Sequence, residues 1–135
     1  MNDILIIDDE DDIREALRRV LERAGYRIRT AEDGADGLTK MQQRAADIII
    51  TDIIMPKLNG VETIAAMRER YPHARIIAIS GGGNFGVTDY QPDAITTSAY
   101  LAAANKAGAH IILTKPFDSA DLLKAIADLV QSGRA

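Results

Sequence analysis

Short apolar runs that end in acidic or hydroxyl-bearing residues alternate along this chain with longer segments of helical periodicity. The two clearest runs are 4–7 and 47–51, and an aspartate follows each of them. Runs this rich in isoleucine and leucine are typical of strands buried on both faces of a parallel sheet. We predict three further strands, at 26–30, 75–80 and 109–113, of which 26–30 is the more exposed.

The segments between these strands carry apolar residues at helical spacing. We predict helices at 12–24, 34–44, 61–70, at a segment containing Tyr100, Leu101 and Ala104, and at 118–130. Strands that alternate with helices imply an α/β fold with helices on both faces of a parallel sheet. We therefore expect one domain over 1–135, a doubly wound, flavodoxin-like (βα)5 sheet with strand order 2-1-3-4-5.

The composition excludes several classes of function. The chain has 16 Lys and Arg against 20 Asp and Glu, and this net charge of −4 argues against direct binding of nucleic acid. Four arginines in the segment 12–24 form a basic stripe, but two glutamates interrupt it. No apolar run approaches the ~20 residues that span a bilayer. There is no signal-peptide pattern and no cysteine, so we expect a cytoplasmic protein without disulfides or thiolate metal sites.

The residues whose side chains could bind a ligand or react lie at the ends of the predicted strands. Asp8 and Asp9 follow the strand at 4–7, Asp52 follows 47–51, Ser80 ends 75–80, and Lys115 follows the last strand. In a parallel sheet, ligands bind outside the carboxyl ends of the strands, so these side chains should converge. Three neighbouring carboxylates repel one another, and their oxygen-only donor set favours Mg²⁺ over zinc.

The same residue types suit the formation of an acyl phosphate. A carboxylate such as that of Asp52 can attack phosphorus and form an aspartyl phosphate. The ammonium group of Lys115 and a metal ion would balance charge on the phosphoryl oxygens, and Ser80 could donate a hydrogen bond to one of them.

Four strings in the sequence resemble the receiver domains of two-component response regulators. They are ILIIDDE at 4–10, DIIMPKLNG at 52–60, IS at 79–80 and TKPF at 114–117, and together they cover nearly the whole chain. The resemblance implies that Asp52 is the phosphoacceptor and that Asp8, Asp9 and the backbone carbonyl of Ile54 join it in holding Mg²⁺. It also implies that Ser80 is a switch hydroxyl and that Lys115 contacts the phosphate.

The resemblance implies a signalling function rather than classical enzyme activity. The expected donor of the phosphoryl group is a sensor histidine kinase or a phosphotransfer protein, and the phosphorylated surface would then bind a downstream protein. Transfer to Asp52 and later self-dephosphorylation would be autocatalytic. We expect a single-domain regulator similar to the chemotaxis type. The alternative is a regulator from which an output domain was removed. Dimerisation on phosphorylation is a further expectation that the sequence leaves open.

Two features depart from the family pattern. Receivers usually have an aromatic residue three positions before the lysine, where this chain has Ile112, so switching through an aromatic rotamer is not expected. The segment 81–97, which follows Ser80, is also about a dozen residues longer than is usual in the family. Long loops in compact domains are commonly functional. Our hypothesis is that this one covers the phosphate or contacts a partner.

Other interpretations of the same residues are weaker. The string G-x-G-x-x-G at 81–86 has the spacing of a dinucleotide fingerprint, but it does not open a helix directly after a strand, as that motif requires. Phosphohydrolases of the dehalogenase type also combine Asp, Ser and Lys, but they carry their nucleophile on the first strand. A scaffold that works without phosphorylation would be expected to lack some of the site residues. We interpret Asp11 and Asp12 as helix-capping acids, since Asp12 and Glu15 have capping-box spacing.

Overall fold

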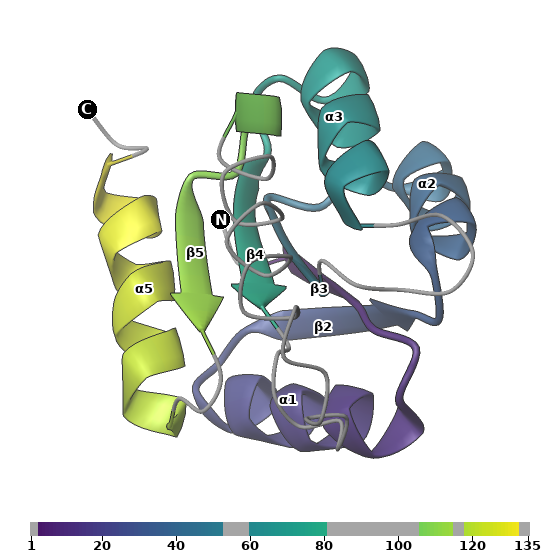
Figure 1. Cartoon of the computed structure of the whole chain (residues 1–135). Helices are drawn as coiled ribbons and strands as arrows, with labels where there is room; N and C mark the ends of the chain where they lie inside the picture. Colours follow the sequence, from purple (N-terminus) through teal and green to yellow (C-terminus); the bar gives the residue numbers. More distant parts are fainter. Residues whose placement is uncertain (1–2, 53–59, 81–105, 115–117, 133–135) are drawn as a thin grey trace, which may run out of the picture.

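The computed structural model describes residues 3–52, 60–80, 106–114 and 118–132. In chain order its elements are β1 (Asp3–Ile7), α1 (Asp11–Arg23), β2 (Arg27–Ala31), α2 (Gly34–Gln43), β3 (Ile48–Asp52), α3 (Gly60–Arg70), β4 (Arg75–Ser80), β5 (Ile111–Thr114) and α5 (Ser119–Ser132). The strands form one parallel sheet in the order β2-β1-β3-β4-β5, which confirms the predicted topology (Figure 1). The segment 81–97 and the predicted helix containing Tyr100 lie outside the described residues.

Two layers of helices cover the sheet (Figure 1), and the core is divided into two clusters of buried side chains, one under each layer. Successive residues of a strand point to opposite faces, so Leu5 and Ile7 pack toward α2 and α3 while Ile4 and Ile6 pack toward α1 and α5. All residues of β3 are buried, as expected for a strand covered on both faces. Full burial of each isoleucine side chain of β3 stabilises the fold by about 1.5–3 kcal/mol. This packing fixes the strand ends that carry the candidate site.

The start of α1 differs from the capping-box interpretation. The helix begins at Asp11 after Glu10, and no side chain caps its first turn. Glu15 does not reach back to the N-terminus, because its carboxylate accepts hydrogen bonds from Arg18 at 2.7 Å and Arg19 at 3.2 Å. The capping box is therefore wrong. Asp11 and Asp12 do lie in the first turn, where their negative charges interact favourably with the helix dipole.

The strand β5 begins at Ile111, two residues later than predicted. Gly108 has a φ of 125°, which turns the chain sharply just before the strand. The backbone N–H of His110 donates to the Ile76 carbonyl at 2.8 Å, but the Ile76 N–H donates to the His110 imidazole Nδ1 at 3.0 Å. A side-chain atom is therefore the acceptor for a backbone N–H of β4, and regular pairing starts only at Ile111.

Within the described residues, no helix has the length and apolar character that a bilayer crossing requires.

Candidate functional site

Three carboxylates converge at the carboxyl edge of the sheet. Asp8 and Asp9 directly follow β1, and Asp52 is the last residue of β3, the strand paired with β1. One carboxylate oxygen from each of the three lies within 4.8 Å of the others. Because parallel strands end at the same edge, residues 43 or more positions apart meet at one place.

The cluster is half enclosed by the protein. Asp8 is 1 % exposed and Asp52 is 6 % exposed, whereas Asp9 is exposed. The backbone N–H of Asp8 donates to the Ala31 carbonyl at 3.1 Å, which holds Asp8 at the end of the β1–β2 ladder. One of its side-chain oxygens, Oδ1, accepts the backbone N–H of Glu10 at 2.9 Å. Two acids are therefore held at fixed positions while the third faces solvent.

Arg14 also positions the cluster, and sequence reasoning did not identify this role. Its Nη1 donates to the backbone carbonyl of Asp8 at 2.7 Å, and its Nη2 pairs with Asp11. A cation near the start of a helix opposes the helix dipole, so it is unfavourable there without another partner. The position of Arg14 near the start of a predicted helix could therefore have indicated, from the sequence, that it has a partner outside the helix.

Asp52 is flanked by two strands. It pairs in register with Ile79 of β4 on one side, and the preceding Thr51 pairs with Ile7 of β1 on the other. The Thr51 hydroxyl donates to the Asp52 carbonyl at 3.1 Å. The carboxylate is therefore attached to the most completely buried strand of the sheet, which limits its freedom to move.

The donor set fits a divalent cation of the Mg²⁺ type. Three ionised carboxylates this close repel one another, and burial of two of them strengthens the repulsion because screening by water is reduced. A bound cation would relieve that repulsion, and carboxylate oxygens are the ligands that Mg²⁺ prefers.

The remaining predicted site residues are described only in part. Ser80 is the last residue of β4 and pairs in register with Thr114 of β5. Since Asp52 is level with Ile79, Ser80 lies one position further along the neighbouring strand. The Ser80 side chain, Ile54 and Lys115 lie outside the described residues.

Ile112, at the position where an aromatic residue was expected, belongs to the core on the side of α2 and α3. It is partly buried and packs against a cluster that includes Ile64, Met67 and Ala109. Its side chain therefore contributes to packing on the face of the sheet that α3 covers.

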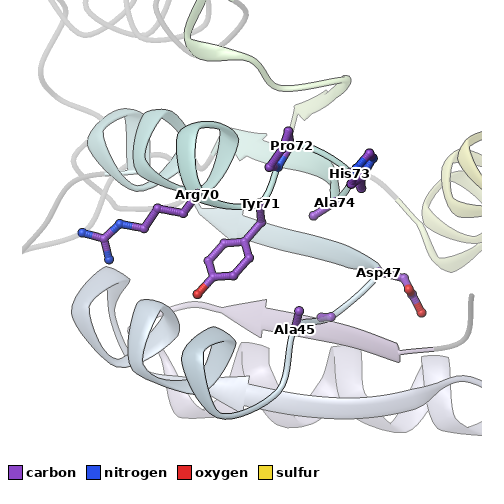
Figure 2. A pocket seen from close by; sticks show the side chains of 8 residues that line it. Ala45, Asp47, Arg70, Tyr71, Pro72, His73 and Ala74 are labelled. Carbon is purple, nitrogen blue, oxygen red and sulfur yellow. The ribbon is translucent and has the colours of Figure 1, made fainter.

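A pocket of about 280 Å³ lies at the other edge of the sheet, before β3 and β4 (Figure 2). Its lining residues are Ala45, Ala46, Asp47, Arg70, Tyr71, Pro72, His73 and Ala74. Figure 2 shows the side chains of Arg70 and Asp47 at opposite ends of the pocket, pointing away from each other. The polar groups do not converge, so the pocket does not form a second chemical site.

Comparisons with known proteins agree with this geometry. The family model described as the response regulator receiver domain matches residues 4–127. The photosynthetic apparatus regulatory protein RegA of Rhodobacter capsulatus is 33 % identical over 91 % of this chain, and the match covers 60 % of RegA. The response regulator receiver protein CpdR of Brucella abortus is 31 % identical over 93 % of this chain and 94 % of CpdR. The crystal structure of a receiver domain protein from Clostridium thermocellum superposes with a TM-score of 0.79 at 30 % identity, over 99 % of this chain and 98 % of that one.

Proposed function

Because the chain belongs to the response regulator receiver domain family, we propose that Asp52 is the residue on which it accepts a phosphoryl group. Receiver domains are signalling phosphoacceptors rather than classical enzymes. The observation that carries the proposal is the convergence of Asp8, Asp9 and Asp52 at the carboxyl edge of the sheet. Of the three acids, Asp52 is the one at the end of the central strand β3.

The proposed reaction is a displacement at phosphorus. A carboxylate oxygen of Asp52 attacks the phosphorus of a phosphohistidine on a sensor kinase or phosphotransfer protein. The new P–O bond forms as the P–N bond breaks, and the imidazole leaves with the electron pair and takes up a proton. Burial of Asp52 to 6 % exposure limits competing access of water to the resulting acyl phosphate.

Asp8, Asp9 and Asp52 are the residues that we propose hold Mg²⁺, with the backbone carbonyl of Ile54 as a further ligand. When bound, the ion supplies charge neutralisation for the carboxylates and the phosphoryl oxygens. Arg14 supports this arrangement, because its hydrogen bond to the Asp8 carbonyl fixes the backbone of the first ligand.

Ser80 and Lys115 complete the proposed site. The hydroxyl of Ser80 would donate to one phosphoryl oxygen, and the ammonium of Lys115 would balance the charge of another. The same groups would assist hydrolysis of the acyl phosphate, so the chain would catalyse both its own phosphorylation and its own dephosphorylation. Movement of Ser80 toward the phosphate would alter the surface next to β4 and change the binding of a downstream protein. We propose that this exchange takes place in the cytoplasm, which suits a chain without cysteines.

The test is phosphorylation by acetyl phosphate in the presence of Mg²⁺, followed by intact mass spectrometry. The wild type should gain one phosphoryl group, and EDTA should abolish the gain. Asp52→Asn should gain none. Asp128→Asn, an exposed acid on α5 that pairs with Lys124, is the matched control and should behave as the wild type does. An adduct that persists in Asp52→Asn would refute the assignment of the phosphoacceptor.

A further inference from the structure

Three basic side chains from three parts of the chain lie at the edge of the sheet opposite the carboxylate cluster. Arg68 belongs to the last turns of α3, Arg75 is the first residue of β4, and His110 immediately precedes β5. All three are half-buried. Figure 1 shows that β4 and β5 begin at the edge of the sheet away from their arrowheads. Asp52 lies at the opposite edge, because it is the last residue of β3.

The imidazole of His110 presents a hydrogen-bond donor. Its Nδ1 accepts the backbone N–H of Ile76 at 3.0 Å, so the proton of the neutral ring is on Nε2. Burial, followed by the nearby guanidinium groups of Arg68 and Arg75, lowers the pKa of His110. The ring is therefore neutral near pH 7 and lies in a region of positive potential.

The guanidinium group of Arg68 is held by contacts other than an ion pair. The side chain of Arg68 crosses Gly108, where a Cβ would lie 2.8 Å from its Cδ and Nε, and its Nη1 donates to the Pro72 carbonyl at 3.0 Å. Among the residues that the structure describes, neither Arg68 nor Arg75 forms an ion pair, although arginines of α1 and β2 do. The cluster therefore has unneutralised positive charge in a chain that is acidic as a whole.

We propose that Arg68, Arg75 and His110 form a docking surface for an acidic segment of a partner protein. Carboxylates of that segment would pair with the two guanidinium groups and accept the Nε2–H of His110. Lys106, which is exposed and only two residues before Gly108, adds a further positive charge to this part of the chain. Several cations favour a segment with several carboxylates over a single small anion. The excess of 20 acidic over 16 basic residues disfavours a nucleic acid in the same place.

The docking surface is separate from phosphorylation. It lies at the opposite edge of the sheet, so its test can use the Asp52→Asn variant and does not depend on the proposed function. Binding to that variant should equal binding to the wild type. The proposal and the assignment of Asp52 can therefore fail independently.

The experiment is an NMR titration of the His110 ring signals with hexaglutamate at low ionic strength. Bound carboxylates should raise the pKa of His110, because they offset the two guanidinium charges. Arg68→Gln and Arg75→Gln should each weaken binding, by up to about fivefold. Arg70→Gln is the matched control, because Arg70 is exposed on the same helix but lines the pocket of Figure 2.

A further variant separates binding from folding. In His110→Asn, the side-chain oxygen can still accept the Ile76 N–H, but the Nε2–H donor is lost. At pH 7, where the His110 ring is neutral, this variant should keep the wild-type thermal midpoint and bind hexaglutamate more weakly.

Three results would overturn the proposal. One is an unchanged pKa of His110 at saturating hexaglutamate, and another is equal weakening by Arg70→Gln, which would indicate unspecific attraction. The third is tighter binding of inorganic phosphate or a twelve-nucleotide oligothymidine, which would replace the acidic segment with a different ligand.

Discussion

Replacement of Gly37 by alanine tests how closely α2 packs on the strand that leads to the site. A Cβ at this position would lie 2.5 Å from Cδ1 and 3.0 Å from Cγ1 of Ile7, and 3.6 Å from Cε of Met67. Ile7 is fully buried and directly precedes Asp8. The added methyl group must therefore displace a packed core side chain next to a candidate metal ligand.

Two effects of opposite sign determine how much Gly37→Ala changes the free energy of unfolding. Overpacking of a dense core costs about 1–3 kcal/mol, whereas alanine in a helix interior gains about 1 kcal/mol over glycine. We expect Gly37→Ala to lower the free energy of unfolding by about 1 kcal/mol. Ala35→Gly, at an exposed position of the same helix, measures the propensity term alone and should cost about 1 kcal/mol.

A double-mutant cycle identifies the clash directly. Ile7→Val deletes Cδ1, the atom nearest to the added Cβ, and should by itself cost about 0.5–1.5 kcal/mol. The double variant should be more stable than the sum of the two single effects by at least about 0.5 kcal/mol, since the two residues are in contact. Urea unfolding followed by far-UV circular dichroism measures all four proteins.

A steric clash with Ile7 is refuted if Gly37→Ala is as stable as the wild type or if the effects of the two substitutions on the free energy of unfolding are additive. Either result would mean that the interface between α2 and β1 accommodates the methyl group without displacing Ile7.

Three further predictions concern other parts of the molecule. Gly108→Ala should lower stability by more than about 1 kcal/mol in urea unfolding, because its φ of 125° strains an L-residue and the Arg68 side chain occupies the space of the Cβ; a neutral effect would contradict this. The lowered pKa of His110 means that the unfolded state binds more protons, so this residue's contribution to stability is present above about pH 6.5 and lost as the pH falls. His110→Asn should flatten that part of the stability profile, and an unchanged profile would argue against it. Added Mg²⁺ should raise the thermal midpoint of the wild type, because its binding adds about 1.4 kcal/mol to the free energy of unfolding for each tenfold excess over the dissociation constant. Asp9→Asn should lose most of this gain, and an equal gain in both proteins would speak against the carboxylate cluster as the metal site.

The order of helices and strands could be read from the sequence because it is encoded locally. Apolar runs at 4–7 and 47–51 and helical periodicity between them depend only on neighbouring residues. The parallel topology followed from the alternation, since crossovers are short and right-handed. Together they were sufficient to bring Asp8 and Asp52 to one edge of the sheet.

Predictions from the local sequence pattern were wrong where another side chain supplied the hydrogen-bond partner. β5 starts at Ile111 because the imidazole of His110 takes the place of a backbone acceptor for Ile76, 34 residues earlier. Glu15 has capping-box spacing, yet it pairs with Arg18 because the helix begins earlier than the pattern suggested. In both cases two hydrogen-bond partners were available, and the spacing of residues in the sequence does not show which of them is used.

The sequence by itself determined which residues end the strands, and therefore which chemistry could gather at the edge of the sheet. Only the tertiary structure decided how closely Asp8, Asp9 and Asp52 approach, that Arg14 holds the Asp8 backbone, and that Gly37 is needed beneath Ile7. The physical reason is that periodicity arises from contacts a few residues apart along the chain. Distances between elements depend instead on how every side chain of the core packs at once.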